Sequence, residues 1–146
     1  FKYMPFNVQA ALGYAQFLRL DELVERKREQ FLFYKNSLSD IEGLHFNEEP
    51  DHVFNSYWIT TLVLDKSFGI KTFDFMKMLE KVGVPSRPFF YPLSSLPAYN
   101  QRSQYESLNT VAYDVSNRGI NLPGAANLTR EQMEFVVEGI RSVLKK

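Results

Sequence analysis

The feature that most constrains the fold is the run NSYWITTLVL at residues 55–64. β-Branched and aromatic residues dominate this run, which is typical of a β-strand. Side chains alternate between the two faces of an extended chain, and here both faces would carry apolar groups. The run therefore predicts a central strand covered on both sides. Shorter strands are expected soon after Asp40 and at residues 120–122.

Helical patterns flank this strand. We expect one long helix from an N-cap at Asn7 to about Leu38, and a second over residues 72–82, capped by Thr72 and closed by Gly83. A third is expected at 108–118, and a last one after Thr129, where T-x-x-Q forms a capping box before a one-sided apolar stripe. Strands that alternate with helices predict an α+β (α/β layered) fold.

Charge and cysteine content exclude several classes of protein. Lysine plus arginine and aspartate plus glutamate both number 17, so the net formal charge is zero. The sequence therefore gives no electrostatic reason to bind nucleic acid or an anionic membrane, and the charged run DELVERKRE is interpreted as a solvated helix face. Cysteine is absent, which excludes disulfides and thiolate nucleophiles. His45 and His52 stand in irregular chain without other ligands around them, so we expect no metal site.

The segment 84–99, VPSRPFFYPLSSLPAY, contains four prolines, which favour an extended chain. In such a chain Arg87, Phe89 and Tyr91 would share one face. Two interpretations stay open on the pattern alone. One is an edge strand with aromatic packing and an exposed arginine. The other is a rigid binding loop with an anion-seeking guanidinium and stacking rings.

The chain opens on FKYMPF, with aromatic residues where a free terminus is normally polar. This start predicts a fragment whose preceding part is missing, rather than a processed protein with an aromatic terminus. The small residues from Ala10 to Gly13 allow close approach of another backbone. We therefore expect the opening segment to pack on a missing domain or on a second subunit.

Three stretches carry a family resemblance: FKYMPFNVQAALGYAQFLRLDELVERKRE, GVPSRPFFYPLSSLPAY and NRGINLPGAANLTREQMEFVVEGIR. In order and spacing they resemble the C-terminal part of the DegT-like nucleotide-sugar aminotransferases, in particular the perosamine-synthase-like members. The matching residues of the first stretch are Tyr3, Asn7, Gln9, Ala10, Ala11, Leu12, Gly13, Gln16, Leu20 and Asp21.

The resemblance implies a pyridoxal 5'-phosphate enzyme of the aspartate-aminotransferase fold. Residues 1–38 would form an inter-domain and dimer-interface loop with a long helix, and residues 39–146 a small domain with a mostly antiparallel sheet packed by helices. The N-terminal cofactor domain, with the catalytic lysine, would be absent from this chain, so no catalytic residue is assigned here. The parent protein would be a cytoplasmic homodimer that transfers an amino group from glutamate to a nucleotide-linked 4-keto-6-deoxy sugar. The alternative is a free-standing, non-catalytic α+β domain that binds a small ligand or has a regulatory role.

The resemblance also implies site residues. The opening loop would reach the partner subunit's cofactor phosphate through Lys2, Tyr3 and Met4. Lys2 suits a phosphate, whereas Met4 stands where relatives often carry a cationic or polar residue and offers no charge. Substrate contacts are implied at Arg87, Phe89, Tyr91 and Ser94. The serine stands where many relatives have a histidine.

Overall fold

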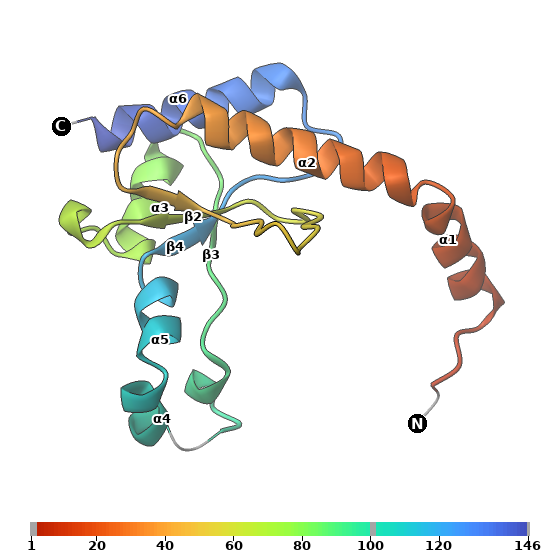
Figure 1. The fold of residues 1–146 in the computed structure, drawn as a ribbon, viewed down its shortest axis with the longest axis horizontal. Coiled ribbons are helices and arrows are strands. Elements are labelled where there is room, and N and C mark those ends of the chain that lie inside the picture. The colour runs from red at the N-terminus through yellow and green to blue at the C-terminus, as the bar shows by residue number, and fades with distance from the viewer. Residues whose placement is uncertain (1–2, 100–101, 146) are drawn as a thin grey trace.

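The computed structural model of the chain describes residues 3–99 and 102–145 (Figure 1). The helices are α1 (Asn7–Phe17), α2 (Leu20–Ser37), α3 (Thr72–Lys81), α4 (Arg102–Leu108), α5 (Thr110–Ser116) and α6 (Arg130–Leu144). The strands are β1 (Leu44–Phe46), β2 (Thr61–Leu64), β3 (Arg87–Pro88) and β4 (Gly119–Asn121). Two 3-10 turns cover Lys66–Phe68 and Leu93–Ser95.

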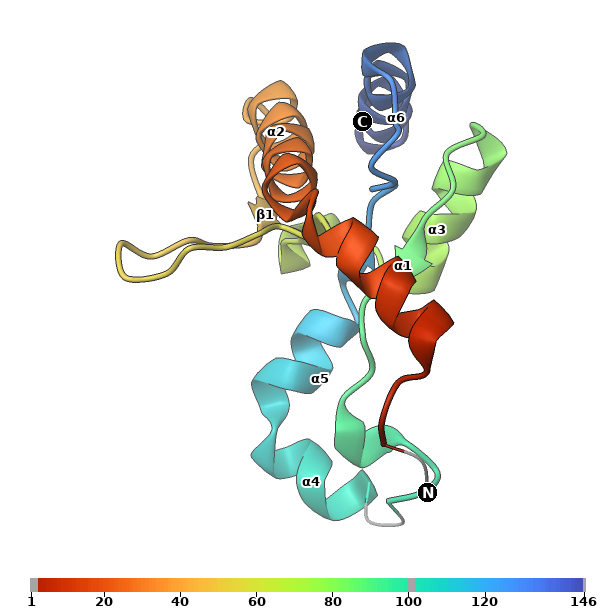
Figure 2. The same cartoon turned by 90° about the vertical axis from the view of Figure 1, so that its right-hand side faces the viewer.

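The strands form one antiparallel sheet in the order β1-β2-β4-β3. The strand β2 lies inside the sheet, as its sequence predicts. Figures 1 and 2 show α2, α3 and α6 on one side of the sheet, and α4 and α5 on the other. The expected α+β fold, a small antiparallel sheet packed by helices, is confirmed.

The hydrophobic core lies between the sheet and the helices α2, α3 and α6. Leu62 and Leu64 of β2 point into it together, because alternate residues of a strand share a face. The stripe on α6 is buried as predicted, and Gly83 closes α3 with a φ of 79°. The buried core residues are Tyr34, Leu38, Leu62, Leu64, Phe75, Leu79, Val84, Ile120, Leu122, Val136, Val137 and Ile140.

The single long helix predicted for residues 7–38 is wrong, because the chain turns between α1 and α2. The Arg19 N–H donates to Gln16 O, three residues back, at 3.1 Å. This is the 3-10 hydrogen-bond pattern, in place of the four-residue α-helical one, and it ends α1. The Arg19 guanidinium then pairs with both carboxylate oxygens of Glu22 at 3.0 Å, in the first turn of α2. Neither proline nor glycine marks the turn, so the sequence gives no signal for it.

The strand predicted for residues 55–64 is also too long, since only Thr61–Leu64 pairs in the sheet. The Tyr57 N–H donates to the Asn55 side-chain oxygen at 2.9 Å, and Tyr57 has a φ of 46°. This Asx turn breaks the alternation that the run suggests. The Tyr57 ring instead stacks on Phe31 of α2 at 3.6 Å between centroids.

Three smaller expectations need correction. The helix predicted at 108–118 is confirmed only in part, as the shorter α5 (Thr110–Ser116), and the helix α4 before it is not predicted. The N-cap of α1 is Phe6 rather than Asn7, and that of α3 is Lys71. The Thr72 hydroxyl donates to backbone oxygens of the segment that leads into β4, and so links α3 to the sheet. The capping box of α6 at Thr129 is confirmed.

Candidate functional site

A cavity of about 400 Å³ lies beside the end of the sheet where β3 begins and β4 ends. Three parts of the chain enclose it: Lys27 on α2, the Trp58 segment before β2, and the backbones that flank β3 and follow β4. Arg87 on β3 is among its lining residues. Arg87, which the sequence predicts as a substrate contact, thus lines the same cavity as Lys27 and Trp58, which the sequence does not single out.

Two cations and no carboxylate line this cavity, within the part of the chain that the structure describes. The Lys27 ammonium donates a hydrogen bond to Gly124 O. Burial lowers the pKa of Lys27, since desolvation disfavours the charged form. Arg87 is exposed on the edge strand and stands opposite Asn121 in the register. Among the described residues, neither cation forms an ion pair, so the cavity carries uncompensated positive charge.

A buried asparagine fixes this end of the sheet. Asn121 accepts a hydrogen bond from the Thr61 hydroxyl at 3.1 Å and donates one to Pro88 O at 3.2 Å. The bond to Pro88 ties the edge strand β3 to β4, and the bond from Thr61 ties β4 to β2. Together they hold the backbone that carries Arg87. The Trp58 side chain is 59% exposed, and its ring lies 6.2 Å from that of Phe90. An aromatic surface thus adjoins the cationic cavity.

The other predicted substrate residues do not line this cavity as described. The Phe89 N–H donates to Gly119 O at 3.1 Å, and its half-buried side chain packs so closely that a Cβ added at Gly119 would lie 3.0 Å from Phe89 Cβ. The Ser94 hydroxyl lies 3.0 Å from that of Tyr113. Tyr91 is exposed. Phe89 and Ser94 are thus engaged within the domain, while Arg87 and Tyr91 are available to a ligand.

Two of the predicted cofactor residues, Tyr3 and Met4, belong to the short segment that precedes α1, which lies away from the sheet (Figure 1). Tyr3 and Met4 are 88% and 77% exposed, and Lys2 lies outside the described residues. Pyridoxal phosphate would need a lysine, a carboxylate for its ring nitrogen and a phosphate cradle. Within the described residues the cavity beside Lys27 has no carboxylate, so it does not fit the whole cofactor.

Lys27, Trp58 and Asn121 are the residues that sequence reasoning missed. Lys27 belongs to the charged run that was interpreted as a solvated face, and its partner Gly124 is 97 positions away. No local pattern reveals such a contact. The run at residues 55–64 predicts a strand that includes Trp58, whereas the turn at Tyr57 leaves the Trp58 ring exposed.

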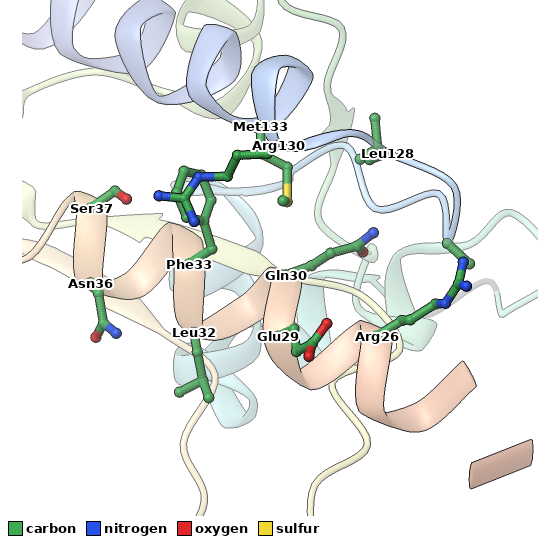
Figure 3. Close-up of a pocket in the computed structure, with 11 residues that line it drawn as sticks. Arg26, Glu29, Gln30, Leu32, Phe33, Asn36, Ser37, Leu128, Arg130 and Met133 are labelled. Carbon is green, nitrogen blue, oxygen red and sulfur yellow. The ribbon is translucent and has the colours of Figure 1, made fainter. Parts of the chain in front are cut away.

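A larger hollow of about 800 Å³ lies between α2 and the start of α6 (Figure 3). Its two arginines are already engaged. Arg26 pairs with Glu22 at 3.0 Å, and Arg130 pairs with Glu134 at 2.8 Å while lying 4.1 Å over the Phe33 ring. Its charge is therefore compensated, and the smaller cavity is the better candidate for an anionic ligand.

The described residues contain no group of three or more histidine, aspartate or glutamate side chains placed to hold a metal ion. Across residues 3–99 and 102–145, no helix is both long and apolar enough to cross a membrane.

The chain is similar to curated proteins over almost its whole length. It is 32% identical over 142 residues to a GDP-perosamine synthase of Vibrio cholerae. The aligned stretch covers 97% of this chain and 38% of that relative. It is 34% identical over 138 residues to EpsN of Bacillus subtilis strain 168, whose name assigns it, without demonstration, to pyridoxal phosphate-dependent aminotransferases; 93% of this chain and 35% of EpsN are covered. The chain thus spans less than two fifths of the length of these relatives.

The fold also matches solved structures. The PLP form of Spr1654 from Streptococcus pneumoniae superposes with a TM-score of 0.82 at 21% identity, covering 94% of this chain and 35% of that one. At this identity the match concerns the fold alone. The profile of the DegT/DnrJ/EryC1/StrS aminotransferase family matches residues 1–141. The chain therefore belongs to the DegT/DnrJ/EryC1/StrS aminotransferase family.

Proposed function

We propose that the protein carrying this chain is a pyridoxal phosphate-dependent aminotransferase that moves an amino group from glutamate to a nucleotide-linked 4-keto-6-deoxy sugar. The observation that carries the proposal is the family match over residues 1–141. The similarity to a GDP-perosamine synthase over 97% of the chain supports a nucleotide-linked sugar as the acceptor. In this proposal residues 39–146 form the small domain, and the cofactor domain lies outside the chain.

Pyridoxal phosphate, when bound, supplies the carbonyl group that takes up and releases the amino group. The chain would contribute to its binding through Lys2, Tyr3 and Met4, which reach the cofactor phosphate of a second subunit. The exposure of Tyr3 and Met4 in the segment before α1 supports this role. Met4 would contribute contact area and no charge.

For the substrate we assign Arg87, Phe89, Tyr91 and Ser94. Arg87 would bind an anionic group directly, because its planar guanidinium is exposed and has no described carboxylate partner. Tyr91 would offer its exposed ring to the nucleotide. Phe89 and Ser94, held by the domain, would keep the segment rigid between these two contacts.

The protein would act as a homodimer in the cytoplasm. The helix α1 supports the dimer, since it buries none of its residues within the chain. Short helices gain most of their stability from tertiary packing. A second subunit, or the cofactor domain, would therefore cover α1.

The test uses protein from the full coding sequence, glutamate and a panel of nucleotide-linked keto-sugars, with the aminated sugar detected by mass spectrometry. Arg87→Lys keeps the charge but loses the planar fork, so we expect a KM about 10-fold higher, with unchanged cofactor content and Tm. Arg26→Lys is the control, because Arg26 forms an exposed pair with Glu22.

Two outcomes would count against the proposal. If Arg87→Lys has wild-type kinetics, or only loses stability, Arg87 has a structural role and its assignment as a substrate-binding residue is withdrawn. If the protein binds sugar nucleotides yet transfers no amino group from any donor, the non-catalytic binding domain becomes the better interpretation.

A further inference from the structure

We propose that the cavity lined by Lys27 and Arg87 is an oxyanion-binding subsite, in which Lys27 is a substrate-binding residue. The inference rests on the proposed function and deepens it, since it adds a second cation and a defined place for an anionic group of a substrate. The composition, which is neutral overall, does not point to Lys27. The juxtaposition of α2 with the flanks of β3 and β4 does.

The first argument is charge. Lys27 and Arg87 line one cavity, and none of its described lining residues carries a negative charge. Lys27 is partly removed from water without a described counter-ion, which is unfavourable, and a bound anion would relieve that cost. Arg19, Arg26 and Arg130 each pair with a glutamate. Within the described part of the chain Lys27 and Arg87 form no ion pair, and unlike the exposed Lys77 and Lys81 they line one cavity together.

The second argument is the environment of Lys27. Its ammonium has one described partner, the carbonyl of Gly124, so further N–H donors remain for an anion. Partial burial lowers the pKa of Lys27, and no described acid offsets this. A perturbed lysine in a concave site is a candidate for function.

The third argument is shape. The wall beside the cations is fixed, because the Asn121 side chain on β4 hydrogen-bonds to Thr61 on β2 and to Pro88 on β3. The exposed ring of Trp58 lines the same cavity. An anionic group between the cations would thus have an adjacent flat surface for a ring or a base.

The anionic group could come from two sources, the diphosphate of a sugar nucleotide or a carboxylate of the amino donor. Both present oxygen acceptors that suit an ammonium and a guanidinium. The experiment separates them. Inorganic pyrophosphate and L-glutamate are titrated separately, by calorimetry, into protein from the full coding sequence, with ionic strength held constant by sodium chloride.

Lys27→Met keeps the length of the side chain and removes its charge. We expect it to weaken binding of pyrophosphate, or of glutamate, by ~10-fold or more, and Lys27→Arg to retain most of the affinity. Lys81→Met is the matched control, since Lys81 is exposed at the end of α3, away from the described lining of the cavity. The probe whose binding depends on Lys27 identifies the source of the anion.

A second measurement needs no variant, in case Lys27→Met fails to fold. Limited acetylation at mildly alkaline pH, read by peptide mass spectrometry, should modify Lys27 readily because its pKa is lowered, and the bound probe should slow this several-fold. A merely structural lysine would show no such protection. The proposal is overturned if neither probe protects Lys27 and Lys27→Met binds both probes as the wild type does.

The two proposals fail separately. Lys27-dependent anion binding in a protein that transfers no amino group would leave the subsite standing and remove the proposed function. If the wild type transfers amino groups but Lys27→Met binds both probes as the wild type does, the proposed function stands and the subsite proposal is removed.

Discussion

At the scale of single residues, a cluster around Glu49 fastens the loop before β2 to α2. Arg28 makes two contacts to the Glu49 carboxylate, at 2.5 and 3.0 Å. The Asn55 N–H donates to the same carboxylate at 2.8 Å, and the Tyr57 hydroxyl at 3.3 Å. The hydrogen bond from Arg28 and that from the Asn55 backbone lower the pKa of Glu49 from 4.5 to about 2.

This depressed pKa makes a pH-dependent prediction. A carboxyl group whose folded pKa lies below its unfolded one stabilises the fold above pH 4.5, and this stabilisation is lost as the pH falls toward 2. We therefore expect Glu49→Gln to melt several degrees below the wild type at pH 7, with the gap closing near pH 2. Glu48→Gln, at the exposed neighbour, should match the wild type throughout. A gap that stays constant from pH 7 to 2 would show that packing, and not charge, is lost.

The sequence predicts residues whose signal is local and misses those defined by distant partners. Arg87 was identified by its resemblance to a family motif. Lys27 meets Gly124 across 97 positions, and Glu49 meets α2 through Arg28. Chain folding brings these groups together, so neither spacing nor composition could reveal them.

At the scale of elements, α6 was predicted almost completely, because its start and its buried face are local patterns. The Thr129 hydroxyl accepts from the Gln132 N–H at 3.2 Å, and the Gln132 side chain accepts from the Thr129 N–H at 2.9 Å. Thr129→Ala should lower the free energy of unfolding by about 1 kcal/mol, as measured by urea denaturation. Thr110→Ala, at the exposed start of α5, should cost less than half of that. Equal losses would mean that the capping box adds nothing.

A second element-scale prediction concerns the contact between α6 and the chain after α3. A Cβ added at Gly139 would lie 2.5 Å from Cγ2 of Val84, which is fully buried and stiff at χ1. Overpacking of this kind costs about 1–3 kcal/mol, which exceeds the gain of ~1 kcal/mol in helix propensity. Gly139→Ala should thus destabilise the protein in urea denaturation. A stabilised variant would show that Val84 moves aside freely.

Elements whose ends are not marked by a proline, a glycine or a capping motif were predicted less well. The turn between α1 and α2 has no proline or glycine, and the Asx turn at Asn55 lies within a β-rich run. In both places hydrogen bonds specific to this chain decide the outcome over the general propensity. A small antiparallel sheet packed by helices was predicted, but its strands are shorter than the sequence patterns suggest.

At the scale of the whole molecule, the chain leaves its first helix uncovered. The helix α1 buries no residue, and Leu12 is 66% exposed. A Cβ added at the next residue, Gly13, would meet no described heavy atom within 4 Å apart from its chain neighbours and the backbone of its own helix. An exposed apolar helix with an open glycine suits close packing against another backbone. The expectation that this segment meets a second subunit stays a prediction, and mass measurements test it.

Leu12→Glu tests which surface covers α1 in protein made from the full coding sequence. If a second subunit packs there, the variant loses a buried leucine and must bury a carboxylate, so the dimer should weaken at least about 100-fold, and sedimentation velocity at micromolar concentration should show monomers. Leu32→Glu, at an exposed leucine of α2, is the control and should leave the mass unchanged. An unchanged dimer with a lower Tm would instead place α1 against the same subunit's other domain. Wild-type mass and Tm together would mean that nothing covers α1, and the interface assignment of residues 1–38 would then be withdrawn.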